Sequence, residues 1–176
     1  TLMSLLATGC FSNFVTQNEK PPYSRLPEIA VPQEPHYDNF GRRIVFVQSN
    51  SPLIAWAFNK NGIPTVEYNP HTMKFKSKEV QSLIFYHEVG HIKLHVDSGR
   101  QPLSNGVEDE AYCYSFFYLK EKIQYTAEQI VKAYRKIGYA NYYESSYEKL
   151  ALNCLVFNYN ENYPITPRGI RSLLER

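Results

Sequence analysis

The pattern of apolar residues changes at Ser77, and this change constrains the fold more than any other feature of the chain. Before it, three short segments rich in β-branched and aromatic residues predict strands at 43–48, 54–58 and 63–68. After it, apolar residues and histidines recur at steps of three and four, which is the spacing of one helix face. The residues of this stripe are Val80, Leu83, Ile84, His87, His91 and Leu94. Strands followed by helices predict an α+β fold.

The second and third predicted strands are joined by a tight turn. Asn61 and Gly62 supply the positive φ angles that a two-residue hairpin turn requires. Pro64 has no N–H to donate to a neighbouring strand, so we expect the 63–68 strand to lie at a sheet edge, at least locally. Ser77 is expected to cap the helix that follows.

Helical patterns continue to the end of the sequence. Thr126 with Gln129, and Ser145 with Glu148, have the spacing of capping boxes at helix starts. Thr166 is followed by a proline, which favours the first position of a helix. The helices predicted in this part cover residues 107–122, 126–137, 145–157 and a short last segment from 166. We therefore expect a small antiparallel or mixed sheet with an edge hairpin, packed on the stripe helix and followed by a mostly helical C-terminal part.

Length and composition restrict the number of domains and the class of partner. The chain has 176 residues, of which 43% are hydrophobic and 20% are charged, and these values fit one globular domain. The formal net charge is only +2, and the basic residues form no concentrated stripe. A nucleic-acid partner is not expected, because such binders concentrate positive charge on one face.

The first forty residues differ in composition from the rest. Residues 1–10 are small, apolar and uncharged, and their last four, ending at Cys10, resemble the lipobox of a bacterial lipoprotein signal. Five prolines lie within residues 21–35, which favours an extended spacer. We therefore predict a signal remnant and proline-rich tether at 1–40, and one folded domain at 41–176. A short buried strand or helix that contains Cys10 is the alternative.

One pentapeptide of the stripe helix, His87-Glu88-Val89-Gly90-His91, contains residues that can bind a metal ion and transfer a proton. Residues four apart lie one above the other on a helix, so both imidazoles can reach one metal ion. Neutral imidazole suits Zn²⁺, and two histidines leave room for a third protein ligand and a water. Glu88, turned about 100° from His87, can take a proton from that water and pass it to a leaving amine. In the alternative, the histidines only fill an apolar stripe and need other buried partners.

Candidates for the third metal ligand follow the pentapeptide in the sequence. His95 continues the spacing, but three histidines at successive four-residue steps span about 12 Å along a helix and cannot converge on one ion. Asp97 has the position of the third ligand of metzincins, but Leu94 stands where their turn needs a glycine. The better candidate is the acidic segment Glu108-Asp109-Glu110-Ala111, which opens the next predicted helix. These acids can also be explained as a complement to the helix dipole.

These residues together resemble a known family. Residues 54–119 are similar to bacterial zinc metallopeptidases of the gluzincin type, close to the M48-like and ImmA/IrrE-like peptidases. The hairpin, the pentapeptide and the acidic segment 108–111 occur in the family's order. In the family this segment reads Glu-x-x-Ala-Asp or Glu-x-x-Ala-Asn with the first Glu on zinc. That glutamate corresponds to Glu108, with Ala111 in register, and Glu110 is the alternative if the register slips by two. Tyr112 stands where the family has the Asp or Asn that orients a ligand histidine.

The resemblance implies a fold, a cofactor and a mechanism. It implies a zincin-like domain in which one Zn²⁺ is held by His87, His91 and Glu108, and peptide bonds are hydrolysed with the glutamate of the pentapeptide as base and then acid. The substrate is expected to lie extended along an edge strand, at 54–58 or 63–68. A second group that stabilises the oxyanion is expected from the C-terminal region. Its candidates are Tyr142, Tyr143, Arg168 and Arg171.

The three cysteines bear on where the protein is located. If Cys10 carries a lipid, the domain is exported and anchored to a bacterial membrane, and Cys113 and Cys154 can pair in an oxidising compartment. Two free buried cysteines are the alternative. The expected partners are a peptide or protein substrate and, through Cys10, the membrane.

Two other functions compete with an exported peptidase. One is a cytosolic regulatory protease similar to ImmA/IrrE, in which Cys113 and Cys154 are reduced and residues 1–10 are ordinary structure. The other is a zinc-binding module without catalytic activity, which is motivated by Tyr112 at the position of the orienting acid.

Overall fold

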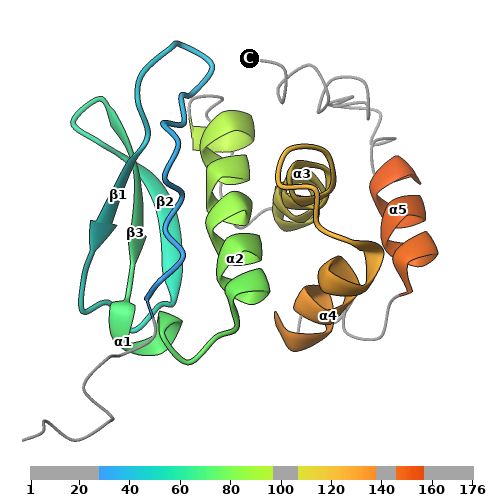
Figure 1. Cartoon of the computed structure of the whole chain (residues 1–176). Coiled ribbons are helices and arrows are strands. Elements are labelled where there is room, and N and C mark those ends of the chain that lie inside the picture. Colours follow the sequence, from blue (N-terminus) through green and yellow to red (C-terminus); the bar gives the residue numbers. More distant parts are fainter. Residues whose placement is uncertain (1–27, 97–106, 138–145, 157–176) are drawn as a thin grey trace, which may run out of the picture.

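The computed structural model describes residues 28–96, 107–137 and 146–156. In these residues a three-stranded sheet lies on one side of a long helix, and three further helices lie on the other side (Figure 1). Strands come first along the chain and helices follow, so the predicted α+β class is confirmed. Within the described ranges, no helix is both long enough and apolar enough to span a bilayer.

The sheet is mixed and small. Its strands are β1 (Val45–Gln48), β2 (Ala55–Lys60) and β3 (Ile63–Tyr68). They lie in the order β1-β3-β2, with β1 parallel to β3 and β2 antiparallel to it. All three predicted strands are therefore present.

The turn between β2 and β3 is the predicted two-residue hairpin, in which Asn61 and Gly62 have φ angles of 53° and 85°. The prediction for Pro64 is correct only locally, because β3 is the central strand. Pro64 pairs with β2, but β1 pairs with β3 only from Thr65 onward, so the missing N–H of Pro64 breaks no ladder to β1. The prediction of 63–68 as a substrate edge is therefore wrong, whereas β2 is an edge strand.

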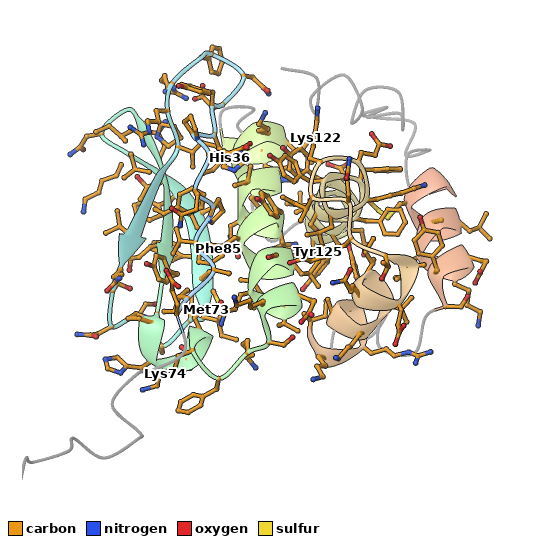
Figure 2. All side chains as sticks on the ribbon, viewed as in Figure 1. His36, Met73, Lys74, Phe85, Lys122 and Tyr125 are labelled. Carbon is orange, nitrogen blue, oxygen red and sulfur yellow. A yellow bond between two sulfur atoms is a disulfide. The ribbon has the colours of Figure 1, made fainter. Side chains whose placement is uncertain are left out.

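The stripe helix is α2 (Lys78–His91), which the change of period at Ser77 predicts. The backbone of Ser77 has the extended geometry of an N-cap, but its hydroxyl makes no capping hydrogen bond. Phe85 lies between α2 and the sheet, where its ring meets the rings of Phe46 and Tyr68 edge-on (Figure 2). This contact anchors the helix to the sheet through buried apolar area.

Two short helical segments flank α2. α1 (Pro70–Met73) follows β3 and is capped by Asn69, whose side chain accepts a hydrogen bond from the N–H of His71 at 2.8 Å. At the other end, α2 continues directly into a π-helical turn, η1 (Ile92–Val96), which carries His95. Such turns are rare and are often found at functional sites.

The later helices confirm most of the predicted pattern. They are α3 (Val107–Glu121), α4 (Ala127–Ile137) and α5 (Tyr147–Val156). The capping box of α4 is formed, since the N–H of Thr126 donates to Gln129 at 2.9 Å and the N–H of Gln129 donates to Thr126 at 3.2 Å. At α5 the hydroxyl of Ser146 accepts from the N–H of Lys149 at 3.3 Å. Ser145 and the last predicted helix lie outside the described residues.

α2 and α3 are in close contact at Gly90. A Cβ at this position would lie 3.1 Å from the carbonyl oxygen of Ala111 and 3.1 Å from the Cβ of Tyr114. Glycine therefore allows the two helix backbones to approach more closely than any larger residue would. The approach brings the first turn of α3, which contains Glu108, toward the histidines of α2.

A disulfide joins α3 to α5 through Cys113 and Cys154, whose Cα atoms are 5.1 Å apart. Both residues are buried. Of the two alternatives for these cysteines, pairing is the one present in the structure. Cys10 lies outside the described residues.

The described part of the predicted tether, residues 28–40, packs on α2 (Figure 1). The N–H of Ala30 donates to the side chain of Gln81 at 2.7 Å. Further along this segment, His36 is 7% exposed, and its ring meets that of Tyr86 edge-on. The packed part of the molecule therefore includes residues that precede 41.

Candidate metal centre

His87 and His91 project from one face of α2, as their four-residue spacing predicts. Their Nε2 atoms are 3.0 Å apart, and their rings are almost perpendicular to each other, at 88°. Both residues are buried, with 7% and 8% of their surface exposed. The two nitrogens therefore face a common point in a partly dehydrated environment.

Glu108, in the first turn of α3, completes this group. Its Oε2 lies 3.2 Å from Nε2 of His87, and its Oε1 lies 3.4 Å from Nε2 of His91. One ligand atom from each of the three residues lies within 4.8 Å of the others. The side chain of Glu108 is 37% exposed, so the group is in contact with solvent on this side.

The separations fit a single metal ion. Ligand atoms placed 2.0–2.1 Å from Zn²⁺ at tetrahedral angles are about 3.3 Å apart. Here the two Nε2 atoms are 3.0 Å apart, and each lies 3.2 or 3.4 Å from one of the two carboxylate oxygens of Glu108. Two histidines and one glutamate are also a known ligand set of catalytic zinc sites, with the fourth position left for water or substrate. The three residues could therefore hold one metal ion, and the same ligand types also suit other divalent transition metals.

The ionisation of the ligands favours metal binding at neutral pH. Burial lowers the pKa of His87 to about 4, although hydrogen bonding to Glu108 acts in the opposite direction. Hydrogen bonds with His87 and His91 hold the pKa of Glu108 well below its usual range. A neutral imidazole and an ionised carboxylate are the forms that bind a metal.

Glu88 lies beside the three ligands and is also buried, with 8% of its surface exposed. Burial raises the pKa of Glu88 to about 7, and the negative charge of Glu108 contributes, while His91 and a hydrogen bond from the backbone N–H of Ala57 oppose the rise. A carboxyl group whose pKa is near the working pH can both accept and release a proton. Because Ala57 belongs to β2, the edge of the sheet positions this carboxylate.

Glu110, the alternative third ligand, faces a different partner. Its Oε2 lies 2.7 Å from Nε2 of His95, whose Nδ1 in turn lies 3.2 Å from Nδ1 of His91. Of the two glutamates, Glu108 is therefore the one beside the paired Nε2 atoms. The sequence pattern does not predict the contact between His95 and Glu110, because it depends on how η1 and α3 pack together.

Tyr112 contacts His87 through its ring, with 4.0 Å between the ring centroids and 39° between the planes. Among the described residues, Nδ1 of His87 is buried without a hydrogen-bond partner. Tyr112 therefore does not give His87 the orienting hydrogen bond that the Asp or Asn of the family gives to a ligand histidine. Ring contact restrains this imidazole instead.

A cavity of about 170 Å³ opens beside His87 and Glu88. It lies between the start of β2, α2 and the end of α4. Most of its lining is apolar or aromatic, from Ile54, Ala55, Val80, Ile84, Tyr112 and Ile137. Lys76 and Lys136 also line it. Sequence reasoning did not single out Lys76, Lys136 and Ile137 as site residues, because they come from separate parts of the chain and share no local pattern.

Several candidates named from the sequence lie outside the described residues. They are Asp97, Tyr142, Tyr143, Arg168 and Arg171. Comparison with protein-family models, with curated proteins and with solved structures gave no match. The metal centre is thus supported by its own geometry, and the family resemblance by sequence motifs alone.

Proposed function

We propose that this protein is a zinc-dependent peptidase of the gluzincin type. The observation that carries the proposal is the buried carboxyl of Glu88, which lies beside the group His87, His91 and Glu108 and lines a cavity. A metal site needs only the three ligands. An adjacent acid with a pKa raised to about 7 and an open space for a substrate are features that hydrolysis requires.

The roles of the residues follow from this arrangement. A bound Zn²⁺ would polarise the substrate carbonyl and make a water molecule nucleophilic near neutral pH. Glu88 would accept the proton of the attacking water and then donate it to the leaving amine. The hydrogen bond from Ala57 would keep the carboxylate oriented during both transfers. His87, His91 and Glu108 would hold the ion.

The substrate would be a peptide that lies extended along β2. This strand lies at an edge of the described sheet, where an extended peptide can be added beside it. An apolar cavity of roughly 150 Å³ can hold a benzene molecule. The cavity beside Glu88, at about 170 Å³, would therefore accept one leucine- or phenylalanine-sized side chain. Lys76 and Lys136 would favour substrates with an acidic group next to that side chain.

Replacement of Glu88 by Gln tests the catalytic part of the proposal. Loss of the general base is expected to lower the rate of peptide cleavage by about 10³-fold. Zinc content should remain near that of the wild type, because Glu88 is not one of the three ligands. The measurement pairs elemental analysis with cleavage of a peptide library rich in leucine, phenylalanine and acidic residues.

Two controls make this test decisive. His87→Ala should lose both zinc and activity, which ties hydrolysis to the metal. A wild-type protein that binds zinc but cleaves no peptide of the library would favour the alternative function, a metal-binding module without catalytic activity. The ring contact of Tyr112, at the position of an orienting acid, is the observation behind that alternative.

We further propose that the domain is exported and anchored through a lipid on Cys10. The disulfide between Cys113 and Cys154 supports an oxidising compartment, since such bonds are rare in the cytosol. Mass spectrometry of the protein from host membranes should find a diacylated N-terminal cysteine at position 10. An intact, unmodified residue 10 together with free thiols at 113 and 154 would instead favour the cytosolic regulatory protease.

A further inference from the structure

His91, His95 and Glu110 form a buried chain of hydrogen-bonding groups. Nδ1 of His91 lies 3.2 Å from Nδ1 of His95, and Nε2 of His95 lies 2.7 Å from Oε2 of Glu110. The three residues are 8%, 2% and 7% exposed. The chain runs from the side of His91 that faces away from the ligand group to the first turn of α3.

The geometry allows one arrangement of protons when His91 binds a metal through Nε2. Its proton must then be on Nδ1, from which it is donated to Nδ1 of His95. Because that nitrogen acts as acceptor, His95 carries its own proton on Nε2. This proton is donated to the carboxylate of Glu110, and all four polar atoms of the chain are satisfied.

The two histidine ligands differ in this respect. Among the described residues, Nδ1 of His87 has no hydrogen-bond partner, whereas Nδ1 of His91 has one. Hydrogen bonds to the outer nitrogen of a ligand histidine fix its tautomer and ring orientation and increase its basicity toward the metal. Of the two histidine ligands, His91 is the one whose outer nitrogen is held by such a hydrogen bond.

We propose that His95 and Glu110 are positioning residues that hold His91 in its metal-binding tautomer and thereby raise the affinity of the site for its ion. This inference rests on the proposed function only in requiring a metal at His87, His91 and Glu108. Two carboxylates from one turn of α3 then have different roles at the metal site. Glu108 is a ligand, and Glu110 supports a ligand through an intervening imidazole.

The local structure explains why His95 can fill this position. It belongs to η1, which continues α2 past His91, so its ring stays beside the ring of His91 at 5.3 Å between centroids. Three histidines along one helix cannot converge on one ion. The third instead contacts the outer nitrogen of the second, and the start of α3 supplies the carboxylate of Glu110 on its other side.

Zinc affinity of the full chain, measured by competition with a chromophoric chelator, tests this proposal. Glu110→Gln keeps the size and a hydrogen-bond acceptor but removes the charge, and should weaken zinc binding about tenfold. His95→Gln should weaken it by about 10- to 100-fold, because the chain is interrupted at its centre. Glu128→Gln, an exposed change on α4 that also removes one negative charge, is the matched control and should leave the affinity unchanged.

Nitrogen NMR of the zinc-loaded wild type gives a second readout that a merely structural role would not produce. Long-range proton–nitrogen correlations should show His91 protonated on Nδ1 and His95 protonated on Nε2. These spectra also decide the question if His95→Gln fails to fold. The opposite tautomer of His95 would overturn the proposal.

The outcomes separate this inference from the proposed function. Zinc affinities of the Glu110 and His95 variants within twofold of wild type would overturn the positioning role and leave the peptidase proposal intact. Weaker binding by both variants in a protein that hydrolyses no peptide would support the positioning role and contradict the peptidase. A wild type that binds no metal would overturn both.

Discussion

His36 is an ionisable residue enclosed by aromatic rings. The rings of Phe46, Tyr86 and Tyr118 surround it, with centroids 5.5 to 6.2 Å away. Among the described residues its Nε2 is buried without a hydrogen-bond partner. Burial, and to a smaller extent the positive charge of Lys93, lowers the pKa of His36 to about 4. The imidazole is therefore held neutral between the N-terminal segment and the aromatic rings on which it packs.

His36→Phe is expected to reduce the sensitivity of the fold to acid. Between pH 6.5 and about 4 the unfolded chain binds a proton at His36 and the folded chain does not, so stability falls as the pH falls through this window. At pH 5 the loss relative to pH 7.5 amounts to about 2 kcal/mol. Urea unfolding of wild type and variant at both pH values measures the difference.

His87 also has a lowered pKa and also makes stability depend on pH. Its contribution is the same in wild type and variant, so the difference between the two proteins reports on His36 alone. An equal loss of stability in wild type and variant on acidification would contradict the assignment.

The histidine ligands could be predicted from the sequence because a helix itself determines which residues share a face. His87 and His91 need no other element to come together. Glu108 and Glu110 could not be distinguished in the same way, since the choice depends on the docking of α3 against α2. The contact of Glu110 with His95 could not be predicted for a further reason. His95 lies in the π-helical turn that follows α2, and the sequence pattern predicts only a regular α-helix there.

At the scale of the elements, the metal centre depends on the distance between α2 and α3. The helices share an interface in which Gly90 faces the backbone of Ala111. The structure supplies a physical reason for glycine at position 90, because an added Cβ would lie against this backbone. Any increase in the separation of the helices moves Glu108 away from the two imidazoles.

Gly90→Ala is expected to weaken both zinc binding and stability. The added Cβ would lie 3.1 Å from the carbonyl oxygen of Ala111, and a helix backbone can yield only by moving as a whole. We expect a loss of about 1–3 kcal/mol in unfolding free energy and at least a tenfold loss in zinc affinity. Urea unfolding and chelator competition measure the two effects.

Lys78→Ala, at the exposed start of the same helix, controls for changes in α2 that leave the interface intact. Unchanged zinc affinity in Gly90→Ala would show that the close approach of the helices is not needed for the site.

Local signals were sufficient for the strands and the hairpin but not for their arrangement. Asn61 and Gly62 define the turn from their own backbone preferences. The parallel pairing of β1 with β3 is set by contacts between residues about twenty positions apart, which local patterns do not encode. Likewise, the proline content of residues 28–40 indicates an extended chain but not that this chain lies on α2.

At the scale of the whole molecule, the disulfide connects the helix that carries Glu108 to the last described helix. Cys113 and Cys154 are 41 residues apart in the sequence, so the bond closes a long loop. A cross-link of this length restricts the unfolded chain and stabilises the native one in the chain-entropy model. The cysteine count allowed this pairing but could not demonstrate it, because three cysteines admit several combinations.

The double replacement Cys113→Ala and Cys154→Ala is expected to lower the unfolding free energy by about 4 kcal/mol, from the entropy of a loop of this length. Denaturant unfolding of the oxidised wild type, the reduced wild type and the double variant measures the effect. Reduction should lower the stability of the wild type and not that of the variant. Cys10→Ser is the control, and equal stability of the oxidised and reduced wild type would contradict the prediction.

The partial exposure of Glu108 has a kinetic consequence. Because one ligand is in contact with solvent, a metal ion can exchange with competing chelators without the chain opening. The hydrophobic core and the disulfide are formed by residues other than the three metal-binding candidates. Under the proposed function the protein would keep its fold as the ion leaves, and the availability of the metal around it would determine how much of it is active.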